Sequence, residues 1–132
     1  MRMLLRPAVA LVAVCLLPLT AYADPSGNWT WTQTLRSGVV REARLTLVLK
    51  GKRVVGGLTS PGPRGEHIYA DLVDGTFDGD IVAFSVVRDI NGQKMTSKYR
   101  GKLLGPFING TIEEPGVTGL MITREWSAKR VM

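Results

Sequence analysis

Three turn signals divide the stretch from Ile68 to Ile112 into runs of strand length, and this pattern limits the folds open to the chain. Asp78-Gly79 and Asn91-Gly92 are Asx-Gly pairs, and Leu104-Gly105 is the third signal. An Asx-Gly pair between β-rich runs favours a type I′ hairpin turn, because both central residues of that turn have positive φ. The stretch therefore predicts four consecutive antiparallel strands.

The run from Lys94 to Arg100 indicates how such a strand lies. Its side chains alternate, with Met95, Ser97 and Tyr99 on one face and lysine, threonine and arginine residues on the other. A period of two with one polar face predicts a strand that covers a core on one side and contacts water on the other.

Four further strands are predicted outside this stretch. They cover Gly27–Thr34, Arg41–Lys50, Arg53–Ser60 and Leu120–Lys129. Gly56-Gly57 predicts a bulge or sharp bend, and residues 60–66 and 113–119 are predicted loops. Eight short strands joined mostly by hairpins predict an all-β fold, an eight-stranded antiparallel up-and-down barrel. The interior of such a barrel is either filled by side chains or open to one small ligand.

The first 23 residues have the pattern of a cleaved signal peptide. Arg2 and Arg6 precede an apolar run from Ala8 to Leu19, and Ala21-Tyr22-Ala23 is a small-x-small cleavage site. We therefore expect a signal peptide over residues 1–23, a single barrel domain over 24–132, and export to the periplasm or the extracellular space. The apolar run is too short to span a bilayer, which needs about 20 apolar residues, so no integral membrane segment is expected after cleavage.

The only cysteine, Cys15, lies inside this leader. Val14 stands before it where a lipoprotein site has a small residue, so lipidation is the less favoured alternative. No disulfide is then available to the exported chain, and its stability must come from core burial. The exported part has a net charge of +4, since 15 of the 17 Lys and Arg residues and all 11 acidic residues lie in it. This charge favours solubility but indicates no specific ligand.

No catalytic, metal or cofactor site is predicted from the residues. His67 is the only histidine, so a zinc site of the usual kind cannot be assembled. Asp74 to Gly79 resembles the first half of a calcium loop, but the position that should be a bidentate Glu is Ser85, and a hairpin is favoured. The basic residues of the central strand lack interleaved aromatics, so nucleic-acid binding is not expected; they are Lys94, Lys98, Arg100 and Lys102.

The inward positions of the predicted strands supply the candidate site residues. Trp29, Trp31 and Trp126 share the inward phase, which favours core packing over an exposed stacking platform. Arg88 shares the phase of Val82, Phe84 and Val86, so it either ends its strand in solvent or enters the barrel mouth. The candidate polar points for a ligand at an open end are Gln33, Arg88, Ser97 and Tyr99.

Gly27-x-Trp29 in the first strand and Arg124-Glu125-Trp126 in the last resemble the calycin pattern of lipocalins and avidins. The resemblance implies that an arginine, Arg124 or Arg130, packs across a tryptophan and closes the barrel. Trp29, Trp31, Arg124 and Trp126 are then the structural residues of that closure. We expect Trp29 and Trp126 on the same side of the closing seam.

The exported segment also resembles an uncharacterised family of small exported bacterial β-barrel domains. The residues that carry this resemblance are Gly27-Asn28-Trp29-Thr30-Trp31, Asp78-Gly79-Asp80 with Phe84 and Arg88, Tyr99-x-Gly101-Lys102-Leu103, Gly110-Thr111-Ile112-Glu113 and Arg124-Glu125-Trp126-x-Ala128-Lys129-Arg130. Members of that family stand alone or beside extracellular sugar-processing domains, which implies no activity by itself.

Three hypotheses about function follow. The first is an exported, non-enzymatic module, a monomer, that binds a small apolar or mixed ligand in the barrel mouth. The alternative is a structural or protein-interaction domain with a filled barrel that acts through its surface. A weaker alternative is a carbohydrate-associated accessory module or a hydrolase, for which the chain offers no catalytic constellation. An interior void of several hundred Å³ would favour the first, and a filled core the second.

Overall fold

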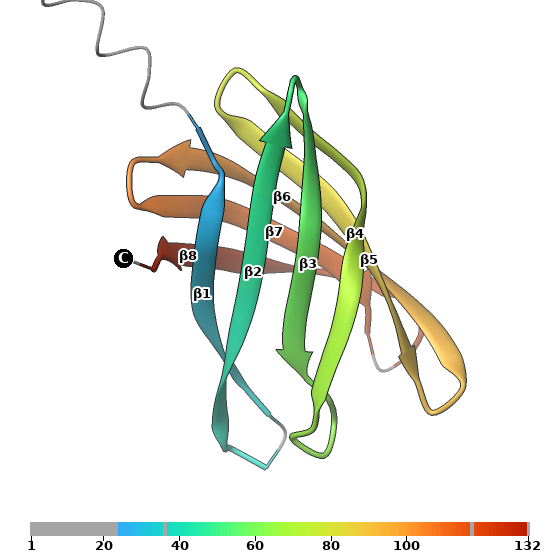
Figure 1. The fold of residues 1–132 in the computed structure, drawn as a ribbon. Coiled ribbons are helices and arrows are strands. Elements are labelled where there is room, and N and C mark those ends of the chain that lie inside the picture. Colours follow the sequence, from blue (N-terminus) through green and yellow to red (C-terminus); the bar gives the residue numbers. More distant parts are fainter. Residues whose placement is uncertain (1–23, 36, 117, 132) are drawn as a thin grey trace, which may run out of the picture.

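Eight antiparallel strands close into a barrel in the computed structural model, which describes residues 24–35, 37–116 and 118–131 (Figure 1). The strands are β1 (Gly27–Thr34), β2 (Val40–Lys50), β3 (Arg53–Pro61), β4 (His67–Asp78), β5 (Ile81–Ile90), β6 (Gln93–Leu104), β7 (Phe107–Pro115) and β8 (Met121–Arg130). Each strand pairs with the next along the chain, and β8 returns to β1. The expected signal peptide and Cys15 lie outside the described residues. Within the described ranges, no helix is long and apolar enough to cross a membrane.

Hairpins occur at all three predicted places of the central stretch, and the type I′ turn is confirmed at Asn91-Gly92, where φ is 54° and 81°. The type I′ turn expected at Asp78-Gly79 is wrong, because β4 includes Asp78 and the turn residues are Gly79-Asp80, of which only Gly79 has positive φ. The third hairpin turns at Gly105-Pro106. The register between β3 and β4 shifts between Arg53 and Gly57, where Gly56-Gly57 predicts a bulge.

Two other local expectations are wrong. Asp74-Gly75 is not part of a hairpin turn, because it lies inside β4 at a second register shift, where Asp74 has φ of 53°. Glu113 and Glu114 are not in a loop, because β7 continues through them to Pro115 and pairs with β8. Glu113 and Glu114 pair with Thr123 and Ile122, whereas Asp74-Gly75 form an unpaired bulge between the paired residues Val73 and Thr76.

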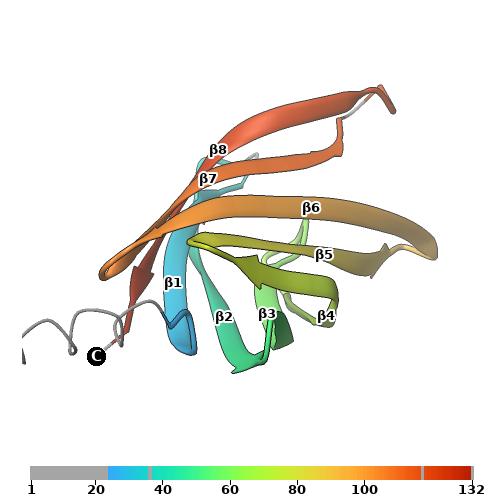
Figure 2. The same ribbon diagram turned by 90° about the horizontal axis from the view of Figure 1, so that it is seen from above.

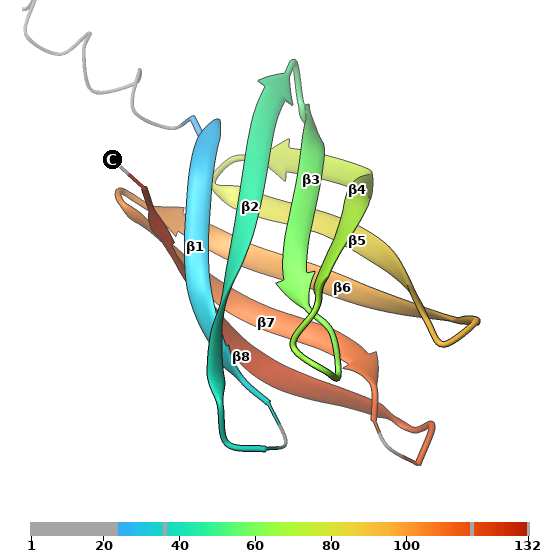
Figure 3. The same cartoon turned by 60° about the horizontal axis from the view of Figure 1, so that its bottom comes forward.

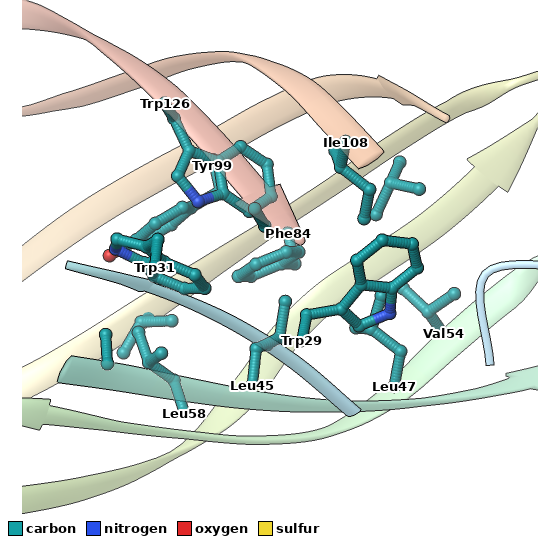
Figure 4. Close-up of a cluster of buried hydrophobic side chains, with 14 of the residues drawn as sticks. Trp29, Trp31, Leu45, Leu47, Val54, Leu58, Phe84, Tyr99, Ile108 and Trp126 are labelled. Carbon is teal, nitrogen blue, oxygen red and sulfur yellow. The ribbon is translucent and has the colours of Figure 1, made fainter. Parts of the chain in front are cut away.

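Side chains of alternate residues fill the barrel interior. Figure 4 shows a continuous cluster in which Trp29 lies near Leu47, Val54 and Ile108 at one end, and Trp31, Tyr99 and Leu58 lie at the other. Trp29 is fully buried, and its indole N–H donates to the carbonyl oxygen of Pro25 at 2.9 Å. The interior that this cluster fills, which we call the lower barrel, is therefore packed, as expected where aromatic residues dominate core energetics.

The strands of the barrel pair unevenly at the two places where its halves meet. Figures 2 and 3 show β1–β4 on one side and β5–β8 on the other. β1 and β8 form only two residue pairs, Trp29 with Arg130 and Thr30 with Lys129. Residues 67–71 of β4 have no registered partner in β5 within the described chain. The halves β1–β4 and β5–β8 are thus paired at one end of the barrel, the closed end, and unpaired at the other end, which we call the mouth.

The closed end also holds the two ends of the described chain. The Arg130 guanidinium lies over the Trp29 indole, 4.4 Å from the ring centroid, and donates to the carbonyl oxygens of Ser26 and Asp24 at 2.7 and 3.0 Å. The amide of Val131 donates to the carbonyl oxygen of Asn28 at 2.8 Å. Arg130, one of the two arginines implied by the calycin resemblance, therefore packs on the tryptophan, whereas Arg124 lies elsewhere.

Candidate functional site

A cleft of about 310 Å³ opens at the mouth, between the β1–β2 and β3–β4 connections and the ends of β5, β7 and β8. Its lining combines apolar side chains with charged ones. The lining residues are Gln33, Thr34, Leu35, Pro61, Gly62, Pro63, Arg88, Ile90, Glu114 and Arg124.

Arg88 enters the cleft because it continues the inward phase of β5. Its guanidinium Nη1 donates to the hydroxyl oxygen of Ser60 at 3.2 Å, and Ser60 is only 1% exposed. Within residues 24–35, 37–116 and 118–131, no carboxylate lies within ion-pair distance of Arg88. A half-buried positive charge with a neutral partner is therefore one feature of the mouth.

Glu114 and Arg124 form the second charged group of the cleft. A Glu114 oxygen accepts from Arg124 Nε at 2.9 Å and Nη2 at 2.7 Å, and its other oxygen accepts from the hydroxyl of Ser97 at 3.2 Å. Ser97 is 2% exposed, so this network links the cleft to the core. The carboxylate is neutralised by Arg124 and held by Ser97.

Tyr99 lies where the apolar core meets these charges. Its ring stacks on Phe84 with 4.9 Å between centroids and meets Trp126 edge-on at 5.2 Å. Burial raises the pKa of Tyr99 to about 12, while nearby Arg88 and Arg124 act against this and Glu114 adds to it. The hydroxyl therefore remains protonated at neutral pH and can donate a hydrogen bond.

Two buried indole N–H groups lie in the same part of the core. Among the described residues, neither Trp31 Nε1 nor Trp126 Nε1 has a hydrogen-bond partner. Figure 4 shows the Trp31 nitrogen and the Tyr99 hydroxyl at the same end of the cluster, away from Trp29. Since most buried polar groups in proteins are satisfied, these two donors require an explanation.

The candidate ligand residues from the sequence come together at the mouth. Gln33 and Arg88 line the cleft, Ser97 binds Glu114 beside it, and Tyr99 is buried close enough for its pKa to respond to the cleft charges. Sequence reasoning missed Glu114 and Arg124 as cleft residues. The signal was strand phase, because Glu114 continues the phase of the buried Ile112 and Arg124 that of the buried Trp126.

Other surface features offer less for chemistry. A groove of about 790 Å³ lies across β2–β4, but several of its polar groups pair with each other or with neighbours, as in Tyr69 with Asp71 and Thr46 with Asn28. His67 is exposed at the start of β4. The part of the chain that the structure describes has no group of three or more potential metal ligands.

Comparison with family models, curated proteins and solved structures gives no match for this chain. The geometry of the mouth is therefore the basis for an argument about function.

Proposed function

We propose that the protein is an exported, non-enzymatic module that binds a small molecule at the mouth of a calycin-like, up-and-down barrel. Export rests on the signal-peptide pattern of residues 1–23. The observation that carries the binding proposal is the cleft itself, where charged and hydrogen-bonding side chains from four strands lie beside an apolar lining. A concave, largely apolar site with a few convergent polar groups is typical of small-ligand pockets.

The packed lower barrel limits where a ligand can lie. Trp29, Phe84 and Trp126 are at most 3% exposed and occupy the interior. A ligand is therefore held above them, in the mouth, and not deep in the barrel. The filled interior also favours the second candidate, a structural or interaction domain without a ligand, and the following experiment separates the two.

The three indole N–H groups report on ligand position by NMR. Trp31 and Trp126 lie toward the mouth, while the Trp29 N–H is hydrogen-bonded at the closed end and serves as an internal control. Titration with neutral naphthalene-1-acetamide is expected to shift the Trp31 and Trp126 signals in a saturable way and to leave the Trp29 signal in place.

Two tryptophan substitutions on β5 provide the matched control. Ile90→Trp fills the cleft and is expected to weaken binding at least about tenfold, because a bulky ring occupies the ligand volume. Val87→Trp adds the same ring to the outer face of the strand, where Val87 is 38% exposed, and is expected to bind as the parent does. Equal shifts of all three indoles, no saturable shift, or unchanged binding by Ile90→Trp would favour the structural domain.

A further inference from the structure

The charges around the mouth do not cancel. Arg124 is neutralised by Glu114 through contacts of 2.7 and 2.9 Å, whereas Arg88 has only the neutral Ser60 hydroxyl at 3.2 Å. The three groups together carry one net positive charge at neutral pH. The side chains of Arg88 and Glu114 are both partly withdrawn from water, so this charge is screened less than a surface charge.

An incompletely paired guanidinium in such a place favours an anion. A partly buried charge is costly unless it is paired, and the pairing of arginine with a planar carboxylate can use two parallel hydrogen bonds. Arg88 lies in the cleft wall and not in a crowded ion-pair network. Its exposed donors therefore remain available to a molecule that enters the mouth.

The uncharged donors of the neighbouring core lie outside the cleft lining, and Trp31 and Trp126 line a separate groove between β1 and β8. The N–H groups of Trp31 and Trp126 are buried donors without acceptors among the described residues, and the Tyr99 hydroxyl is protonated at neutral pH. The indole N–H can only donate, and protonated Tyr99 can donate as well. Because none of these three side chains lines the cleft, the choice of ligand rests on the charges and the apolar wall of the cleft itself.

We propose that the mouth binds a monoanionic organic acid, with its carboxylate against the Arg88 guanidinium and its apolar part along Leu35, Pro61 and Ile90. This inference rests on the proposed function and specifies its ligand class. A dianion such as a phosphate monoester fits less well, because Glu114 lies in the same cleft and the net charge is one. A purely polar acid would leave the apolar wall of the cleft without contacts, so it is expected to bind more weakly than an acid with an apolar part.

The experiment compares naphthalene-1-acetate with naphthalene-1-acetamide, which have the same ring and differ in the charge of the head group. Isothermal titration calorimetry is expected to give the acid at least about tenfold tighter binding than the amide, since hydrogen bonds to a charged group are stronger. The acid is also expected to lose affinity as salt increases, and the amide is not.

Two substitutions are expected to act in opposite directions. Arg88→Met removes the positive charge and lowers the acid's affinity at least about tenfold, while the amide's affinity stays within twofold. Glu114→Gln removes the negative charge and raises the acid's affinity severalfold. Arg100→Met is the matched control, because Arg100 is an exposed arginine on the outer face of β6, and it leaves both affinities unchanged.

The outcomes separate this inference from the proposed function. Equal binding of acid and amide at the mouth, with no response to Arg88→Met or Glu114→Gln, overturns the acid but leaves a small-molecule site. Failure of both compounds to bind contradicts the proposed function as well. Should Arg88→Met fail to fold, the acid-to-amide ratio of the parent protein and the direction of the Glu114→Gln effect still decide the question.

Discussion

At the scale of single residues, Tyr99 joins the core to the site. Its ring belongs to the aromatic cluster, with Phe84 stacked on it and Trp126 edge-on to it. The pKa of its hydroxyl responds to the charges of Arg88, Glu114 and Arg124 at the mouth. Ionising this hydroxyl would place a negative charge where burial opposes it. The residue therefore couples the stability of the barrel to pH.

This coupling predicts a loss of stability at alkaline pH. The pKa of Tyr99 is raised from 10.0 to about 12 in the folded protein. A raised tyrosine pKa gives stability that is fully present below the unfolded value and is lost as pH rises through the folded value. The free energy of unfolding is thus expected to fall between pH 10 and 12 by up to about 3 kcal/mol from this group. Urea denaturation across this range measures it.

Two variants isolate the contribution of Tyr99. Tyr99→Phe has no group to ionise and is expected to lose this part of the pH dependence. Tyr69→Phe is the control: its hydroxyl donates to Asp71, which raises the pKa of Tyr69, but the side chain is 64% exposed. A Tyr99→Phe profile identical to that of the parent between pH 10 and 12 would contradict the assignment.

At the scale of the element, the irregularity of β3 has a steric cause. Gly56 has φ of 144°, and a Cβ at this position would collide with the carbonyl oxygen of Thr46 in β2. Only glycine is tolerated at this position, because its positive φ and its close approach to the Thr46 carbonyl each disfavour a residue with a Cβ. The glycine pair thus allows β3 to bend while it keeps its pairing with β2.

Gly56→Ala is expected to destabilise the protein by about 2–4 kcal/mol, from backbone strain and the displaced Thr46 carbonyl together. Gly51→Ala is the matched control, because Gly51 also has positive φ, 67°, but has open space around its Cβ. Its expected cost is about 1 kcal/mol from strain alone. Urea denaturation of the two variants tests the difference, and equal costs would remove the steric explanation.

At the scale of the whole molecule, strand pairing in the barrel is extensive in some regions and sparse in others. β5 and β6 pair over ten residue pairs, while β1 and β8 pair over two. Regions with few ladder hydrogen bonds open at lower free energy than the whole molecule unfolds. The mouth can therefore widen without disruption of the packed lower barrel.

Native-state hydrogen exchange is expected to show this gradient. The amides of Ile122–Trp126 that point away from β7 have no registered partner in β1 within the described chain, and fast exchange is expected there. The ladder amides of Ser85 and Val86 in β5 are expected to exchange only by global unfolding. Equal protection in the two regions, measured by NMR, would mean that the seam is as stable as the rest.

Most of the fold was predictable because its signals are local. The turn at Asn91-Gly92 and the alternation of Ser97 and Tyr99 each depend on residues adjacent in the sequence. The bulge at Asp74-Gly75 was not predictable, since the same residues also favour a turn and only the register with β5 decides between them. Glu113 and Glu114 are likewise in a strand because they pair with β8, which is a long-range interaction.

The candidate site was predictable in part for the same reason. Strand phase placed Gln33, Arg88, Ser97 and Tyr99 on the inner faces, and the structure puts Gln33 and Arg88 in the cleft lining and Ser97 and Tyr99 in the core next to it. The pairing of Arg124 with Glu114 could not be inferred, because it depends on the register between β7 and β8. Without that pair, the unequal balance of charges at Arg88 is not visible in the sequence.

The contacts of Arg130 fix the geometry by which the domain can be attached to other molecules. Because this side chain bridges the last strand to Ser26 and Asp24, the described chain enters and leaves at neighbouring points, on the side opposite the cleft. Such adjacency of chain ends is what permits insertion of one domain into a loop of another. A surface or a larger protein joined at either end would hold the barrel with its cleft directed outward, open to solutes.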